Sequence, residues 1–386
     1  MRILFIQYGL NPFGGGVQRV THTLAEQFGN RGHITYCAHL SNEDAYPGQP
    51  YSATISLSSS SLQDLTTFII DNGIEIVINQ CGTDVSITKR FAAAKDSCRF
   101  ALISCIHISP LASREVLCYR DWRLPKIAIR SILKECLIRL YPFDRYNLRT
   151  TFDLSDKIVL LSSRFINDYL NLAKVPNNDR VTAIPNPASY PPLKDVNFDS
   201  KAQTFLVVAR MGDSQKRLLR VLDTWKILQD ILPEWDLKLV GDGDNLNDYK
   251  RIASRSKLQR ITFTGIQQPL PYYDKASIFL MTSASEGFGM TLLEAMQRGC
   301  VPVAMDSYKA IHDLIKHRFN GLLVENGNLK AFADACVQLA TSPALRKQMA
   351  LNGIEHTRKF SVSAIANQWD ILLNSLNDCQ KSTIHH

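Results

Sequence analysis

The segment from residue 286 to residue 294, Glu-Gly-Phe-Gly-Met-Thr-Leu-Leu-Glu, puts a carboxylate at each end of a glycine-rich turn. The apolar run Ile278–Thr282 before it predicts a buried strand, and Thr291–Arg298 predicts a helix. We therefore expect Glu286 on the loop after the strand and Glu294 about one turn inside the helix. Free amides at a helix start bind anions, so the segment suits a sugar joined to a phosphate. Two solvated glutamates beside an ordinary helix are the alternative.

Segments typical of strands and helices alternate along nearly the whole chain, which is typical of parallel sheets covered by helices. The predicted strands are Arg2–Tyr8, Ile34–Ala38, Glu75–Asn79, Phe100–Ile106, Lys157–Leu161, Arg180–Ile184, Thr204–Ala209, Asp236–Val240, Ile261–Phe263, Ile278–Thr282, Val301–Ala304 and Gly321–Val324. Prolines in 185–192 separate the two series. The sequence predicts two doubly wound α/β domains, residues 1–190 and 191–364. Ligands of such sheets bind at the carboxyl ends of the strands, here in the cleft between the domains.

Composition is that of a water-soluble globular chain. Its 386 residues suffice for about two domains, 45% of them are hydrophobic, and no apolar run approaches a membrane span. The first residues predict a strand and not a signal peptide. Nine scattered cysteines lack paired metal-ligand spacing, so we expect reduced thiols in the cytoplasm and no zinc.

Positive charge is concentrated in residues 111–150. The chain has a net charge of +8, and this segment carries nine Lys or Arg against four acidic residues. The excess indicates an anionic surface or acceptor, and no motif supports nucleic acid. A helical apolar stripe lies within it: Ile129, Ile132, Leu133, Cys136, Leu137 and Leu140, flanked by Lys126, Arg130 and Lys134. We expect this helix in the first domain, either packed on the core or resting on an anionic membrane.

Several shorter motifs add candidate ligand-binding groups. Gly14-Gly15-Gly16 follows the first strand and could accommodate a phosphate, but a dinucleotide fingerprint would require a third glycine where Arg19 stands. Arg210 and Lys216 follow the first strand of the second domain and suit a diphosphate, unless they form a solvated basic turn. His107 ends a strand and faces either the core edge or the cleft.

A rival interpretation concerns a metal ion. Asp242-Gly243-Asp244 follows the strand Asp236–Val240, and two carboxylates there could chelate a divalent cation that holds a nucleotide diphosphate. The glycines on either side of Asp242 fit a tight turn equally well.

In their order and spacing, these motifs resemble the GT-B glycosyltransferases of family 4, which are retaining enzymes with nucleotide-sugar donors. The matching segments are Gly14-Gly15-Gly16, Leu24-Ala25, Arg31-Gly32-His33, Ile184-Pro185-Asn186-Pro187, Ala209-Arg210, Gln215-Lys216, Val240-Gly241-Asp242-Gly243, Phe263-Thr264-Gly265, Glu286 to Glu294, Gly299-Cys300 and Pro302-Val303. The resemblance implies a GT-B fold, two Rossmann-like domains facing across a cleft. It also implies that a helix over 365–378 packs back on the first domain. Asn79-Gln80 departs from the family, whose corresponding strand end more usually contains His.

Roles for individual residues follow from the resemblance alone. Glu286 would contact hydroxyls of the donor sugar, Glu294 would contact the ribose, and His107 would sit beside the transferred sugar. Arg210 and Lys216 would hold the diphosphate. The remaining donor-binding residues would be Gly15, Gly16, Gly241, Gly265, Ile266, Gly287, Phe288 and Gly289.

The resemblance further implies sugar transfer from a UDP-sugar or GDP-sugar to a saccharide or lipid-linked saccharide, in cell-envelope or exopolysaccharide biosynthesis. No metal and no cofactor are expected, because the nucleotide sugar is itself a substrate. The protein would be cytoplasmic or peripheral at the inner face of the membrane. Two alternatives stay open: a GT-B sugar-nucleotide epimerase or hydrolase, which needs further carboxylates in the first domain, and a non-catalytic nucleotide-sugar-binding module.

Overall fold

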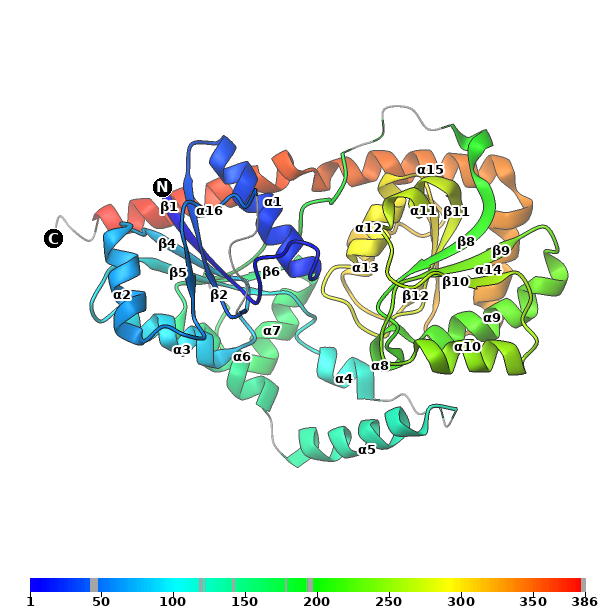
Figure 1. The fold of residues 1–386 in the computed structure, drawn as a ribbon, viewed down its shortest axis with the longest axis horizontal. Helices are drawn as coiled ribbons and strands as arrows, with labels where there is room; N and C mark the ends of the chain where they lie inside the picture. The colour runs from blue at the N-terminus through cyan, green and yellow to red at the C-terminus, as the bar shows by residue number, and fades with distance from the viewer. Residues whose placement is uncertain are drawn as a thin grey trace. The chain divides into compact units, whose positions relative to one another are not determined.

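The chain forms two compact units in a computed structural model (Figure 1), which describes residues 1–41, 48–117, 121, 123–140, 143–177, 179–191, 193 and 197–382. Unit 1 comprises Met1–Pro110, Pro142–Ser189 and Lys359–His386. Unit 2 comprises Leu111–Tyr141 and Tyr190–Arg358.

Unit 1 is built on a seven-stranded parallel sheet with the order β3-β2-β1-β4-β5-β6-β7. Its strands are β1 (Arg2–Gln7), β2 (Ile34–His39), β3 (Thr54–Ser56), β4 (Ile76–Asn79), β5 (Ala101–Ile106), β6 (Lys157–Leu160) and β7 (Val181–Ala183). The apolar residues of β1, β4 and β5 are buried on both faces, as expected of a parallel sheet covered by helices.

Helices cover both faces of this sheet. They are α1 (Gly16–Asn30), α2 (Leu62–Asp71), α3 (Val85–Ala94), α6 (Phe143–Leu154), α7 (Ile166–Ala173) and α16 (Val362–Ser382). Helices α2 and α3 pack their apolar residues against the sheet in one core cluster. Helix α16 packs against α1, where the side chains of Arg31 and Asp370 form an ion pair and Phe28 meets Trp369 edge to face.

Unit 2 contains a six-stranded parallel sheet with the order β10-β9-β8-β11-β12-β13. Its strands are β8 (Ala202–Val208), β9 (Asp236–Val240), β10 (Ile261–Phe263), β11 (Ala276–Met281), β12 (Val301–Asp306) and β13 (Leu322–Glu325). The helices after residue 189 are α8 (Asp213–Lys216), α9 (Leu218–Ile231), α10 (Leu246–Arg255), α11 (Leu270–Lys275), α12 (Met290–Gln297), α13 (Ile311–Leu314), α14 (Leu329–Thr341) and α15 (Pro343–Thr357). Helices α9, α10 and α14 share the main apolar core with the sheet.

The predicted fold class of two Rossmann-like α/β domains is confirmed, and every predicted strand is present. The sequence analysis did not predict β3, a three-residue partly buried strand that lacks an apolar run. It also did not predict the polar helix α10, whose apolar residues are few.

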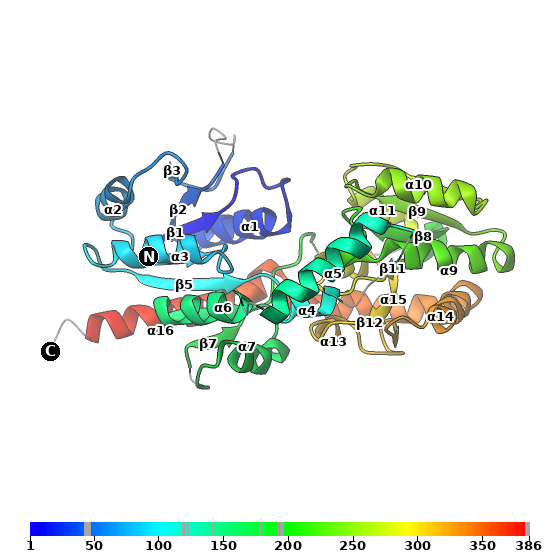
Figure 2. The same cartoon turned by 90° about the horizontal axis from the view of Figure 1, so that it is seen from below.

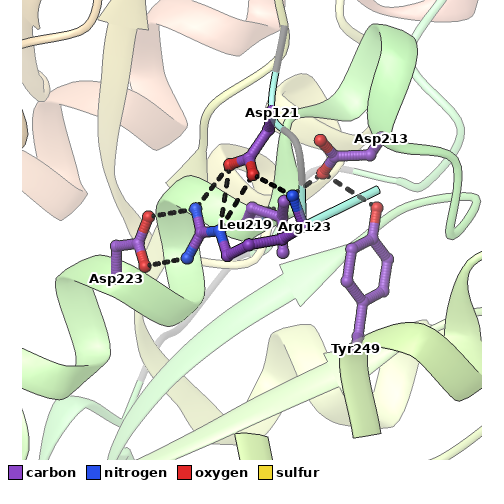
Figure 3. A network of polar contacts seen from close by, with 6 residues as sticks. All are labelled: Asp121, Arg123, Asp213, Leu219, Asp223 and Tyr249. Carbon is purple, nitrogen blue, oxygen red and sulfur yellow. Dashed lines mark hydrogen bonds and ion pairs between the residues drawn. The ribbon is translucent and has the colours of Figure 1, made fainter. Parts of the chain in front are cut away.

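The structure corrects the domain to which we assigned residues 111–141. We expected them in the first domain, but the structure packs them with unit 2, as helices α4 (Ala112–Leu117) and α5 (Pro125–Leu140), which contact each other (Figure 2). Leu124 is buried in the core of unit 2. The Arg123 guanidinium donates to the carboxylates of Asp121 and Asp223, and Asp223 belongs to α9 (Figure 3). The start of α5 is therefore fixed to α9.

The apolar stripe of α5 is only partly covered. Ala128 is buried, but Ile129 and Leu133 are 51% and 60% exposed. Lys126 and Arg130 are exposed as well. Of the predicted basic residues, Arg120 and the side chains of Lys134 and Arg139 lie outside the described part of the chain. Among described residues, the helices lack a stretch long and apolar enough to cross a membrane.

Each sheet has a point where the strand order reverses direction. In unit 1 this point lies between β1 and β4, and in unit 2 it lies between β8 and β11. Loops that leave neighbouring strands in opposite directions open a crevice, and ligands of doubly wound sheets bind there. We therefore expect the functional groups of each unit at its reversal point.

Candidate functional site

Two loops define the reversal point of unit 2. One follows β8 and contains Arg210 and, in the short helix α8, Lys216. The other follows β11 and contains Glu286. Hydrogen bonds tie the two loops together. The Ala284 amide donates to the carbonyl of Gln215 at 2.7 Å, and the Gln215 side chain donates to the carbonyl of Ser285 at 2.9 Å. The Thr282 hydroxyl lies 3.0 Å from the carbonyl oxygen of Lys216. Thus the loops form one structural block.

Lys216 and Glu286 meet across this block. The Lys216 ammonium lies 2.5 Å from Glu286 Oε1, and the two side chains are only 17% and 11% exposed. Lys216, which we predicted to bind the diphosphate, and Glu286, which we predicted to bind the sugar, are thus direct partners. Because water screens such a pair weakly, each charge strongly stabilises the other, and removal of one leaves the other poorly solvated.

A buried carboxylate fixes the backbone that carries Lys216. Asp213 is fully buried, and its Oδ1 accepts hydrogen bonds from the Leu219 amide at 3.0 Å and the Tyr249 hydroxyl at 2.9 Å (Figure 3). Arg217 joins α8 to α9 in the left-handed conformation, with φ of 55°. The sequence analysis missed Asp213, because its partners Leu219 and Tyr249 lie 6 and 36 positions further along the chain.

Helix α12 starts one residue earlier than predicted. Its N-cap is Gly289, with φ of 96°, and not the capping-type residue Thr291. A Cβ atom at Gly289 would lie 2.6 Å from the Tyr308 hydroxyl, so the position requires glycine for both its conformation and its space. Phe288 is buried, and Gly287 is partly exposed. Burial, with the Glu286 carboxylate nearby, raises the pKa of Tyr308 well above its usual value.

Glu294 lies inside α12, as predicted, and is fully buried. Its Oε2 accepts a hydrogen bond of 2.9 Å from the hydroxyl of Tyr273 in α11. Tyr273 is a residue that the sequence analysis missed, because nothing in the sequence relates it to Glu294. Contact of Glu294 with a ribose stays a prediction.

The other predicted residues of unit 2 lie on the neighbouring loops. Arg210 is exposed. Gly241 and Gly265 are joined by a 2.9 Å hydrogen bond from the Gly241 amide to the Gly265 carbonyl, and Ile266 beside them is 79% exposed. A Cβ at Gly241 would lie 2.0 Å from the carbonyl oxygen of Ala209, so this turn requires glycine. The loop after β9 is thereby held directly against the loop after β8.

Asp242 and Asp244 are both exposed. Asp242 Oδ1 accepts from the Gly243 amide at 2.7 Å, which is a local turn contact. No cluster of three or more His, Cys, Asp or Glu with metal-binding geometry occurs among the described residues.

Helix α4 also reaches the block of loops. The Ser285 hydroxyl donates to Glu115 Oε2 at 2.5 Å, and the buried Arg217 guanidinium donates to the Val116 carbonyl at 3.0 Å. Glu115 therefore contacts the residue next to Glu286. Sequence reasoning could not have found this contact, because it treated residues 111–150 as a surface of the first domain.

In unit 1, His107 follows β5 and pairs with Gln80, which follows β4. His107 Nε2 lies 2.5 Å from Gln80 Oε1, so the ring and the amide are hydrogen-bonded. Nδ1 is buried without a partner among the described residues, next to a water-sized cavity of about 10 Å³. Burial lowers the pKa of His107 to about 4, so the ring is neutral near pH 7. Gln80 thus stands where the family resemblance leads us to expect a histidine.

Gly15 and Gly16 lie where α1 begins. Gly15 is the N-cap of α1 and Gly16 its first residue, and the cap lacks a side-chain hydrogen bond. A Cβ at Gly15 would lie 2.7 Å from Gln18 Oε1. Together with His107, these residues belong to unit 1, whereas all the other predicted site residues belong to unit 2.

Part of unit 2 matches a known protein family. Residues 202–342 match the family model described as Glycosyl transferases group 1. That part of unit 2 is therefore a domain of this class, and it contains both reversal-point loops. The Escherichia coli K12 lipopolysaccharide 1,6-galactosyltransferase is 32% identical over 142 residues, 35% of this chain and 38% of that protein. Alignments with curated relatives cover less than two thirds of those proteins' own length.

Solved structures extend the similarity in fold to nearly the whole chain. Sucrose-phosphate synthase of Thermosynechococcus elongatus superposes with a TM-score of 0.78 at 18% identity, over 98% of this chain and 99% of that chain. Anabaena HepE in complex with UDP-glucose gives 0.71 at 17% identity, over 97% and 100%. The fold is thus the GT-B fold of glycosyltransferases.

We expect the Lys216–Glu286 pair to stabilise unit 2. A double-mutant cycle with Lys216→Met and Glu286→Gln should give a coupling free energy of about 1–3 kcal/mol, because each single change leaves a poorly solvated charge. Urea unfolding measures it. The exposed pair Arg149 and Asp153, 2.9 Å apart, is the matched control and should couple by less than about 1 kcal/mol. Equal coupling in the two cycles would contradict the prediction.

Proposed function

We propose that this protein is a retaining, metal-independent glycosyltransferase of family 4. It moves a sugar from a nucleotide-sugar donor to a saccharide or lipid-linked saccharide, in cell-envelope or exopolysaccharide biosynthesis. The observation that carries the proposal is the Lys216–Glu286 pair, at the reversal point of a domain in the glycosyl transferases group 1 class.

Lys216 and Glu286 suit the two parts of such a donor. A diphosphate brings negative charge, which the Lys216 ammonium and the neighbouring Arg210 attract, while sugar hydroxyls donate to the Glu286 carboxylate. When the donor enters, each side chain exchanges its present partner for a ligand group. Neither charge is then left without a partner, which lowers the cost of opening the pair.

The cations also act on the transition state. Negative charge grows on the diphosphate as the bond to the sugar breaks, and the largely buried Lys216 ammonium stabilises that charge strongly. A phosphate oxygen of the leaving group takes the proton from the acceptor hydroxyl on the same face of the sugar, so the anomeric configuration is retained. His107 is neutral near pH 7, so in this mechanism it contributes hydrogen bonds beside the sugar and no charge.

Of the two donors that we predicted, the names of similar proteins support a UDP-sugar. HepE has been solved with UDP-glucose, and the similar Escherichia coli protein is a lipopolysaccharide galactosyltransferase. A GDP-sugar stays an alternative, since Gly265 and Ile266 would meet the base through backbone groups. We propose no cofactor and no metal, and a cytoplasmic location or a peripheral one at the inner face of the membrane.

A panel of UDP-, GDP- and ADP-sugars tests this proposal. The true donor should raise the melting temperature, because it binds only the folded chain, and it should be consumed when an acceptor extract is added. EDTA should leave the rate unchanged, and product NMR should show a retained anomeric configuration. Stabilisation without turnover would favour the non-catalytic module, and conversion without an acceptor would favour the epimerase or hydrolase. Activity restored by manganese after EDTA would give Asp242 and Asp244 a metal-binding role.

We expect Glu294→Ala to weaken nucleotide binding roughly 10- to 150-fold, since the ribose hydroxyls lose a charged acceptor. Calorimetric titration with the best nucleotide of the panel measures the change. Tyr273→Phe is the matched control, because it removes one hydrogen-bond donor to Glu294 but keeps the carboxylate. A folded Glu294→Ala protein with wild-type affinity would remove this residue from the site.

We also propose that α5 rests on an anionic membrane surface. Ile129 and Leu133 are exposed on the same helix as the exposed Lys126 and Arg130. Apolar residues beside cations suit the interface of an anionic bilayer, where each cation contributes about 1 kcal/mol.

Flotation with anionic liposomes tests this contact. Lys126→Ser/Arg130→Ser should lose most vesicle binding at low salt, and Ile129→Ser/Leu133→Ser should lose it at all salt concentrations. The charge-matched control is Lys250→Ser/Arg255→Ser on the exposed face of α10. A wild-type chain that ignores anionic vesicles at low salt would show that α5 is only structural.

A further inference from the structure

Lys201, the residue before β8, lies at the edge of the unit 2 sheet opposite to the candidate site. Its ammonium donates to two backbone carbonyls, that of Tyr273 at 2.8 Å and that of Arg298 at 2.6 Å. The Cys300 sulfur lies 3.8 Å away. In the part of the chain that the structure describes, no carboxylate forms an ion pair with this ammonium. The two carbonyls are therefore its main partners.

Both carbonyls lie at helix ends. Tyr273 belongs to the last turn of α11, and Arg298 is the C-cap of α12. Carbonyls at the end of a helix lack a partner within that helix, and a lysine can supply one. The Arg298 side chain also bonds to Asp274 of α11 at 2.5 Å. Lys201 thus joins the end of α11 to the end of α12.

These two helices hold Glu294 in place. Glu294 lies one turn before Arg298, whose amide donates to the Glu294 carbonyl at 3.3 Å. The Tyr273 hydroxyl donates to Glu294 Oε2 at 2.9 Å. Lys201 bonds to the backbone of both partners, so it fixes the helix that carries Glu294 against the helix that carries Tyr273. Because Glu294 is fully buried in a packed interior, its carboxylate moves only when α12 moves.

The environment of Lys201 makes these bonds matter. Burial lowers the pKa of Lys201, which shows that water solvates the ammonium poorly. The Cys300 thiol donates to the Tyr273 carbonyl as well, at 3.1 Å. Removal of the ammonium would therefore affect the Arg298 carbonyl most, and a buried carbonyl without a partner is costly. We expect the end of α12 to shift in order to find another donor.

We propose that Lys201 is a positioning residue for nucleotide binding: through α11 and α12 it holds the Glu294 carboxylate where ribose hydroxyls can donate to it. The inference rests on the proposed function, in which Glu294 accepts from the ribose. Lys201 acts from the opposite edge of the sheet and does not touch the nucleotide. Its loss should therefore weaken recognition of the ribose and spare recognition of the phosphates.

Calorimetric titration of the full chain with UDP and 2′-deoxy-UDP, and with GDP and 2′-deoxy-GDP, tests the inference. The readout is the ribose preference, which is the dissociation constant of the deoxynucleotide divided by that of the ribonucleotide. The wild type should show a preference of about 10-fold or more for the base that it binds, and Lys201→Met should lower this preference about 3-fold or more, because the carboxylate is no longer held in place. Lys201→Gln keeps an amide donor and should lie between the two. It also serves as the test if Lys201→Met does not fold.

Leu339→Ala is the matched control for lost stability, because it removes a fully buried side chain of α14 from the core of unit 2. Its ribose preference should equal that of the wild type. Glu294→Ala should abolish the preference, and adding Lys201→Met to it should change the preference no further, since both act through one carboxylate.

A purely structural lysine would give a different result. Lys201→Met would then weaken both nucleotides equally or not at all, which overturns the inference and leaves the proposed function standing if the wild type prefers the ribonucleotide. A wild type that binds both nucleotides equally well would overturn the inference by removing the ribose from the role of Glu294. A wild type that binds none of the four nucleotides would overturn the proposed function and this inference together.

Discussion

The hydrogen bonds between the loop after β8 and the loop after β11 are the constraint on which the rest of unit 2 depends. Gln215 and Thr282 each bond to the backbone of the opposite loop. The register of the two loops is therefore set by backbone groups and not by the charged side chains. Because that register is fixed, the side chains of Lys216 and Glu286 lose little conformational entropy when they pair. The same fixed loops receive Glu115 from α4.

The two units share an architecture but have different side chains at the reversal points of their sheets. Both have parallel sheets whose order reverses once, so each offers a crevice at the same topological position. Residues on the loops decide what the crevice can bind, and single side chains there can differ while the sheet stays the same. Lys216 gives unit 2 a cation, whereas Asp84 gives unit 1 a carboxylate that still has a free oxygen.

The sequence predicted the strands well because buried parallel strands leave continuous apolar runs bounded by turns, and Ile278–Thr282 is one example. Local patterns also put Glu286 on a loop and Glu294 within a helix. They could not show that Lys216 pairs with Glu286 or Tyr273 with Glu294, since these contacts join residues 70 and 21 positions apart. Gln80 was noticed only as a departure from a family pattern. Its bond to His107 depends on β4 and β5 being neighbours, which no local pattern encodes.

The chain path of residues 111–141 has a consequence for how the protein folds. These residues lie between β5 and β6 of unit 1 in sequence, yet Leu124 completes the core of unit 2. Unit 1 in turn needs α16 from the end of the chain. When the first half of the chain has been synthesised, neither unit has all its parts. Both units therefore complete their cores only after most of the chain has been made. A cut between residues 189 and 190 would therefore yield two incomplete fragments and not two autonomous domains.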